Sequence, residues 1–190
     1  MDIYEKICDE SILDSEIIEC AKKDSRFDIN WTNGGDYGNW TLLIWTVYHD
    51  RRELAEYLLA DPDIDVNYKD NDGRTALYES CCLNDIYILK LLLGHKGINV
   101  NIQNRYGLTG LHWASCYNNY IEYVKEFLLD ARVDVWIRDE NGLSARDVAI
   151  QDGCRGIANI LGRIGRTSLL RIPNALLCRD IVRKIIEEYM

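Results

Sequence analysis

The side chains that could carry out catalysis or bind a metal are scattered along the chain without a common spacing. The 190 residues include three histidines, His49, His95 and His112, and seven cysteines that form no CxxC pair. Zinc sites take their ligands from short, regular spacings of Cys and His, and none of these spacings occurs here. No nucleophile is paired with a recognisable base, and no carboxylate pair marks a catalytic pocket. The sequence therefore predicts no enzyme activity, no metal and no cofactor.

One glycine-rich segment invites comparison with a phosphate-binding loop. Residues 33–38 read NGGDYG. A phosphate-binding loop lies between a strand and a helix and carries a lysine that reaches the phosphates. This segment has neither feature, so we expect an exposed loop without a bound nucleotide.

The charge, the apolar runs and the cysteines of the chain indicate which partners and which compartment to expect. The formal net charge is -9, and contact with a nucleic-acid backbone needs clustered Lys and Arg, so we expect no nucleic-acid binding. The apolar runs are shorter than the roughly 18 residues of a membrane span, so we expect no membrane insertion. An odd number of cysteines without a leader segment indicates reduced thiols and an intracellular protein, either cytoplasmic or nuclear.

A turn followed by a helix start recurs at a fixed period. The glycines Gly73, Gly107 and Gly142 are 34 and 35 residues apart, and Gly38 begins a related earlier copy. A hydroxyl residue follows each glycine within two or three positions: Thr41, Thr75, Thr109 and Ser144. Glycine accepts the positive φ of a tight turn, and Thr or Ser caps the first amides of a helix. Each copy is therefore predicted to run from a turn into a helix, as in a stacked repeat array.

A second helix and a short polar segment are predicted in each copy. The segments ELAEYLL at 53–59 and IYILKLLL at 86–93 place their apolar residues at helical three- and four-residue spacings. Asp65-Val66-Asn67 and Asn99-Val100-Asn101 then lead to the next glycine turn. A single helix pair cannot bury its apolar face alone, so stability must come from stacking each pair on its neighbours.

This order of turn, cap, helix pair and projecting segment resembles the ankyrin repeat. The resemblance implies an all-α solenoid of helix-turn-helix units with β-hairpin fingers over residues 1–166, divided at 1–30, 31–66, 67–100, 101–135 and 136–166. The family's Thr-Pro-Leu-His stands here as Thr109-Gly110-Leu111-His112 in the best copy, and no copy keeps the proline. His112 matches the family's structural histidine, which hydrogen-bonds near the turn.

The resemblance implies a non-catalytic, monomeric scaffold that binds another protein through its finger tips and the exposed side of its first helices. Trp, Tyr and Arg dominate interface hot spots. The matching positions are Trp31, Tyr37, Trp40, Trp45, Tyr48, Lys69, Asn71, Arg74, Arg105, Tyr106, Leu108, Trp113, Tyr117 and Arg138, with Glu79 and Glu140 on the same side. Packing against the neighbouring repeat is the alternative role for Trp40 and Trp45. The longer first finger and the residues added near Asn119 are further candidates for specificity.

Two asparagines match a pattern of modification in this family. Asn67 follows Leu59 by eight residues, and Asn101 follows Leu93 by the same interval, as in ankyrin repeats hydroxylated by an asparaginyl dioxygenase. The alternative, which we favour, is that each asparagine stabilises the turn of its finger.

The last segment, residues 167–190, leaves the repeat pattern. An amphipathic helix is predicted there from the spacing of Leu176, Leu177, Ile181, Ile185 and Ile186. A helix that caps the last repeat is the simpler interpretation. Leu177-Cys178-Arg179 also resembles the start of a SOCS box, and the tail is similar to F-box-like tails of viral ankyrin proteins, although Asn174 stands where the SOCS motif has Leu. That resemblance implies a substrate receptor of a cullin-type ubiquitin ligase, with a Skp1-like or elongin-like adaptor bound by the tail residues Leu176, Leu177, Cys178, Ile181 and Ile185.

Overall fold

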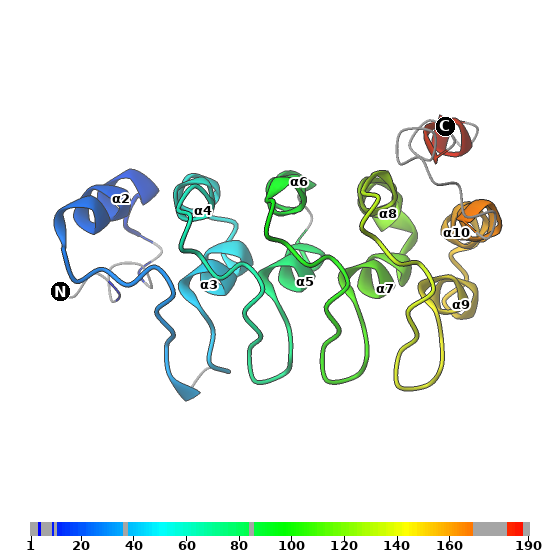
Figure 1. Cartoon of the computed structure of the whole chain (residues 1–190), viewed down its shortest axis with the longest axis horizontal. Helices are drawn as coiled ribbons and strands as arrows, with labels where there is room; N and C mark the ends of the chain where they lie inside the picture. Colours follow the sequence, from blue (N-terminus) through cyan, green and yellow to red (C-terminus); the bar gives the residue numbers. More distant parts are fainter. Residues whose placement is uncertain are drawn as a thin grey trace.

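The helices of the chain stack side by side in two rows (Figure 1). The structure is a computed structural model and describes residues 4, 9, 11–35, 38–83, 86–168 and 182–187. The inner row contains α3 (Leu42–Tyr48), α5 (Ala76–Ser80), α7 (Gly110–Ser115) and α9 (Ala145–Gln151). The outer row contains α2 (Asp14–Lys23), α4 (Arg52–Leu59), α6 (Ile86–Gly94), α8 (Ile121–Leu129) and α10 (Arg155–Ser168). The short 3-10 helix η2 (Asn118–Tyr120) precedes α8, and the predicted all-α repeat fold is confirmed.

Each inner helix begins at the predicted hydroxyl cap. The side chains of Thr41, Thr75, Thr109 and Ser144 accept the backbone N–H three residues further on, over 3.2 to 3.4 Å. The preceding glycines Gly73, Gly107 and Gly142 have φ of 73°, 76° and 77°. Both local predictions, the left-handed turn and the capped helix start, are confirmed.

The loops between the rows project as fingers on one side of the stack (Figure 1). We call residues 68–75 the second finger, 102–109 the third and 137–144 the fourth. One backbone hydrogen bond joins each finger to the one before it: Asn71 N–H to Gly38 O at 2.8 Å, Arg105 N–H to Asp72 O at 2.9 Å and Glu140 N–H to Tyr106 O at 3.0 Å. Strand pairing in the described residues is limited to isolated bridges at Thr32–Thr41 and Arg138–Ser144, so these fingers lack the regular strands of a hairpin.

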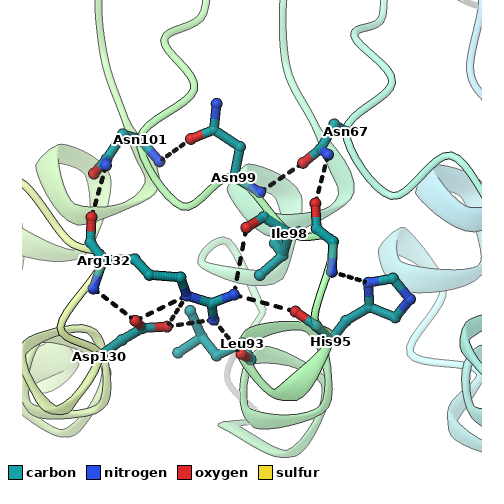
Figure 2. Close-up of polar contacts among 9 residues, drawn as sticks. Asn67, Leu93, His95, Ile98, Asn99, Asn101, Asp130 and Arg132 are labelled. Atoms are coloured by element: carbon teal, nitrogen blue, oxygen red, sulfur yellow. Dashed lines mark hydrogen bonds and ion pairs between the residues drawn. The ribbon is translucent and has the colours of Figure 1, made fainter.

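An asparagine side chain joins each loop after an outer helix to the corresponding loop of the next repeat. The amide of Asn67 donates to Gly97 O at 2.8 Å, and its oxygen accepts Asn99 N–H at 2.7 Å. Asn101 donates to Arg132 O at 2.8 Å and accepts Asp134 N–H at 2.9 Å, and Asn30 bridges the first two loops in the same way. Figure 2 shows the bridge made by Asn67 and the hydrogen bond from Asn101 to Arg132.

The apolar core runs the whole length of the stack. Neighbouring outer helices pack on one another from α2 to α10, and α4, α6, α8 and α10 each pack on the inner helix of the same repeat. Fully buried side chains line this contact from Ile17 in α2 through Leu58, Leu92 and Phe127 to Ile160 in α10. No helix therefore buries its apolar face without a neighbour, as the repeat pattern predicts.

Little of the predicted tail lies in the described part of the chain. Residues 182–187 are helical, and Val182 and Ile185, which are 4% and 6% exposed, belong to the same core as α10. The other predicted adaptor-binding residues lie outside the described residues: Leu176, Leu177, Cys178 and Ile181. None of the described helices is long and apolar enough to cross a membrane.

We predict that Gly107→Ala destabilises the array more than Gly142→Ala. Both glycines have nearly the same positive φ, so both variants carry a backbone penalty of about 1–2 kcal/mol. A Cβ at Gly107 would lie 2.8 Å from the backbone N of Glu140, whereas a Cβ at Gly142 would have no neighbour within 4 Å. Overpacking should cost Gly107→Ala about 1–3 kcal/mol more in urea unfolding. Equal losses of unfolding free energy in the two variants would contradict this prediction, because they would show that the third and fourth fingers move apart without cost to admit the methyl group.

We predict that Asn101→Ala lowers the free energy of unfolding by about 2 kcal/mol, because two inter-repeat hydrogen bonds are lost together. Asn71→Ala is the matched control, since Asn71 is exposed at a finger tip, and should change stability by less than about 0.5 kcal/mol. Thermal and urea unfolding measure both. Similar values for the two variants would contradict a structural role for the asparagine bridges.

Candidate functional site

The tips of the fingers are held by one acid or amide side chain at the same place in each finger. Asp70 Oδ1 accepts the N–H groups of Asp72 and Arg74 at 2.9 and 2.7 Å. Asn104 and Asp139 do the same in the third and fourth fingers, each over 2.8 to 3.0 Å. These three residues were not predicted as functional, although Asp or Asn recurs three positions before each of the glycines Gly73, Gly107 and Gly142. The finger tips are therefore preorganised.

Arg74 in the second finger is surrounded by carboxylates. Its guanidinium lies 3.0 Å from Asp70, 2.9 Å from Glu79 and 3.5 Å from Asp72. The indole N–H of Trp40 donates to the same Asp70 carboxylate at 3.1 Å. Arg74 is thus partly buried and its charge is already neutralised, so it ties finger to helix as well as facing solvent.

Glu79 departs from its predicted position. It was expected on the exposed side of the first helices, but it is 2% exposed on α5. Burial raises the pKa of Glu79, and the positive charge of Arg74 opposes that rise. The third finger and its helix have Leu108 and Trp113 at the places of Arg74 and Glu79, so the ion pair occupies positions that are apolar one repeat later.

The most exposed part of the fingers is basic and aromatic. Arg105 lies over the Tyr106 ring at 4.7 Å and pairs with Asp72 at 2.7 Å. Tyr106 remains 43% exposed. Lys69, Asn71 and Arg138 are exposed beside them, and Leu108 is half-buried. The finger tips thus present rigid side chains of the types found at hot spots.

Aromatic side chains of the inner helices form two groups. In the first, Trp40 contacts Tyr48 at 4.9 Å and Trp45 stacks on His49 at 4.1 Å. In the second, Trp113 contacts Tyr78 at 5.8 Å and Tyr117 at 6.2 Å. Trp40, Trp45 and Trp113 are half-buried, while Tyr48 and Tyr117 are each 50% exposed. The tryptophans therefore contribute to packing, and the two tyrosines reach solvent.

Two predicted contact residues are set apart from these groups. Trp31 is half-buried and stacks on Tyr4 at 4.5 Å, near the start of the chain. Tyr37 lies outside the described residues. We use the name finger face for the second to fourth fingers together with the exposed side chains of α3, α5 and α7 and the residues that follow these helices.

His112 has the structural role that was expected. It is 1% exposed, and its Nδ1 accepts the backbone N–H of Thr109 at 3.2 Å. The ring proton is then on Nε2, which lies 3.3 Å from Leu143 O in the next repeat. Burial lowers the pKa of His112, which keeps the ring neutral. This histidine joins the third finger to the fourth.

Desolvation makes four of the described thiols poor nucleophiles: Cys81, Cys82, Cys116 and Cys154. Burial raises the pKa of Cys116 to about 11 and raises that of Cys81 as well. A reactive cysteine needs the opposite, a lowered pKa in a positive environment. No three His, Cys, Asp or Glu side chains among the described residues are grouped so that they could hold a metal ion.

The proposed hydroxylation sites are occupied by hydrogen bonds. The side-chain amides of Asn67 and Asn101 each donate to the next repeat's loop and accept from it. Figure 2 shows both bonds of Asn67 and the donated bond of Asn101. Hydroxylation of these two asparagines stays a prediction. In the folded array their amides already join neighbouring repeats.

Comparison with known families identifies the repeat. A family model described as ankyrin repeats, in three copies, matches residues 11–104 and 88–166. The matched ranges include every inner helix and all three described fingers. The capped inner helices, the fingers and the match over most of its length together show that this chain belongs to the ankyrin repeat family.

Proposed function

We propose that this chain binds a partner protein through its finger face, with Tyr48, Arg105, Tyr106 and Tyr117 as the main contacts. Ankyrin repeats have a general role in protein–protein interaction and are typically non-enzymatic scaffolds. The choice of these contacts rests on three exposed tyrosines of the finger face. Tyr48, Tyr106 and Tyr117 are 43 to 50% exposed. An exposed aromatic side chain has large apolar area to bury and few rotamers to lose.

The fixed geometry of the fingers favours binding. Asp70, Asn104 and Asp139 hold the tips, and backbone hydrogen bonds join neighbouring fingers. Arg105 is already held between Tyr106 and Asp72. Ordering loops and long side chains on association costs free energy, so a surface that is ordered beforehand binds more tightly for the same contact area.

For the tail we infer a capping role in preference to adaptor binding. Val182 and Ile185 are buried in the core that continues from α10, while Arg183 and Lys184 between them are exposed. Side chains that already pack on the last repeat are not available to an adaptor. The end of a solenoid needs such a cover, because its last helix pair has no further repeat to pack against.

We predict that Tyr106→Ala reduces binding of the physiological partner about tenfold or more, because a central aromatic contact is lost. Tyr87→Ala is the matched control, since Tyr87 on α6 is 41% exposed but lies in the outer row. Quantitative affinity capture with wild type and both full-length variants measures partner recovery, and circular dichroism checks folding. The finger face would be misplaced if Tyr87→Ala lost the partner and Tyr106→Ala kept it.

We predict that Ile185→Ala lowers the free energy of unfolding by about 2–4 kcal/mol, the usual cost of removing a buried isoleucine. Arg183→Ala, at an exposed neighbouring position, should change it by less than about 0.5 kcal/mol. Urea unfolding measures both. Unchanged stability of Ile185→Ala, together with loss of a captured cullin-ligase adaptor, would support the receptor interpretation of the tail instead.

A further inference from the structure

His95 occupies a position that is aspartate in the other described loops after an outer helix. Each of these loops closes a tight turn in which a side chain accepts the backbone N–H two residues further on. The acceptors are Asp24 Oδ1 for Arg26 at 3.0 Å, Asp61 Oδ1 for Asp63 at 2.9 Å, Asp130 Oδ1 for Arg132 at 2.9 Å and His95 Nδ1 for Gly97 at 3.1 Å. An imidazole thus performs in one repeat the task of a carboxylate in the others.

The turn is adapted to the larger ring. A Cβ at Gly97 would lie 3.3 Å from Cε1 of His95, which is closer than most real contacts, so glycine makes room for the imidazole. The residues at this place in the other turns all carry side chains: Arg26, Asp63 and Arg132. The His95 and Gly97 pair is therefore a matched substitution of the aspartate turn.

The chemistry of the acceptor differs in one respect. Nδ1 accepts a hydrogen bond only while the ring is neutral with its proton on Nε2. A protonated imidazole has no acceptor left, whereas a carboxyl group keeps a lone pair on its carbonyl oxygen in either protonation state. Among the four turns, the one at His95 is therefore the one whose side-chain acceptor a single proton removes.

This turn lies where the second repeat meets the third. Gly97 O accepts the amide of Asn67, and Asn99 N–H donates to the same side chain, at 2.8 and 2.7 Å. From the other side, Arg132 donates to Leu93 O, His95 O and Ile98 O at 2.6, 3.2 and 3.4 Å. Figure 2 shows the segment from Leu93 to Asn99 held between these two residues.

The charged groups around His95 balance one another. Lys90 of α6, Lys96 of the loop and Arg132 of the next loop are positive. Glu126 of α8 and Asp130 line the same side, and Glu56 of α4 lines the other side of α6. Lys90 pairs with Glu126 at 3.1 Å and Arg132 with Asp130 at 2.5 Å. Because positive and negative side chains around His95 are equal in number, we expect the main effect of its protonation on the turn to be the loss of the hydrogen-bond acceptor Nδ1.

We propose that protonation of His95 opens the turn at residues 95–97 and loosens the contact between the second and third repeats. Acid then acts locally, at the centre of the array, before the stack as a whole unfolds. The proton on Nδ1 faces the N–H of Gly97, so two donors oppose each other and the side-chain hydrogen bond that closes the turn is lost. The bridge from Asn67 ends on this turn and weakens with it.

Amide hydrogen exchange measured by NMR at pH 7.5 and 5.5 tests this on the full-length chain. After correction for intrinsic exchange rates, protection of the Gly97 and Asn99 amides should fall about tenfold at the lower pH, the effect of losing one hydrogen bond. The amides of Asp63 and Arg132, in the aspartate turns, serve as internal controls and should not change. In His95→Asp, Gly97 should behave as the controls do.

Two results would overturn the proposal. One is a Gly97 amide whose protection follows Asp63 and Arg132 at both pH values in the wild-type chain. The other is the same acid loss at Gly97 in His95→Asp. The wild-type comparison decides even if the variant folds poorly, because global unfolding in acid would lower the protection of all these amides together.

Discussion

The asparagine side chain that bridges successive loops is the interaction on which the array depends. The loops after the outer helices have backbone N–H and C=O groups that no regular strand or helix satisfies. Asn30, Asn67 and Asn101 each satisfy one of each kind in the following repeat. An amide does this because it is donor and acceptor at once. Apolar packing holds the helices together, and these bridges set how one repeat sits on the next.

The fingers recur with the same period as these asparagine bridges, and Asp70, Asn104 and Asp139 hold their tips. The second finger is nevertheless stabilised differently from the third. The partly buried Arg74 pairs with the buried Glu79, and the equivalent positions one repeat later are the half-buried Leu108 and Trp113. Burying charges costs free energy that the pair recovers only with good geometry. Asp70 and Asp72 supply that geometry by holding Arg74 from the finger side. The second finger is thus held to its helix by charge, and Trp40 and Tyr106 flank it with exposed aromatic area.

Local features of the fold could be predicted from the sequence, and features that depend on a neighbouring repeat could not. The glycine turns and the Thr and Ser caps involve residues within four positions, so spacing alone predicts them. The asparagines were assigned to their own finger turns, but their partners lie about one repeat further on. Glu79 was placed on the surface because its burial depends on Arg74 of the same repeat and on the packing of both inner helices beside it. His95 gave no signal, because its role is visible only beside Asp24, Asp61 and Asp130.

Two histidines use a neutral ring nitrogen as a hydrogen-bond acceptor at contacts between repeats. His112 joins the third finger to Leu143 of the fourth, and burial lowers its pKa below the ordinary 6.5. The unfolded chain therefore binds a proton at this residue more readily than the folded chain below about pH 6.5, so stability falls as the pH falls from there. His95 closes the turn on which the Asn67 bridge ends, between the second and third repeats, through a hydrogen-bond acceptor instead of burial. The other described loop turns are closed by aspartate. The two imidazoles thus serve separate contacts of the array, while the first two repeats are joined through Asn30 and its carboxylate-closed turns.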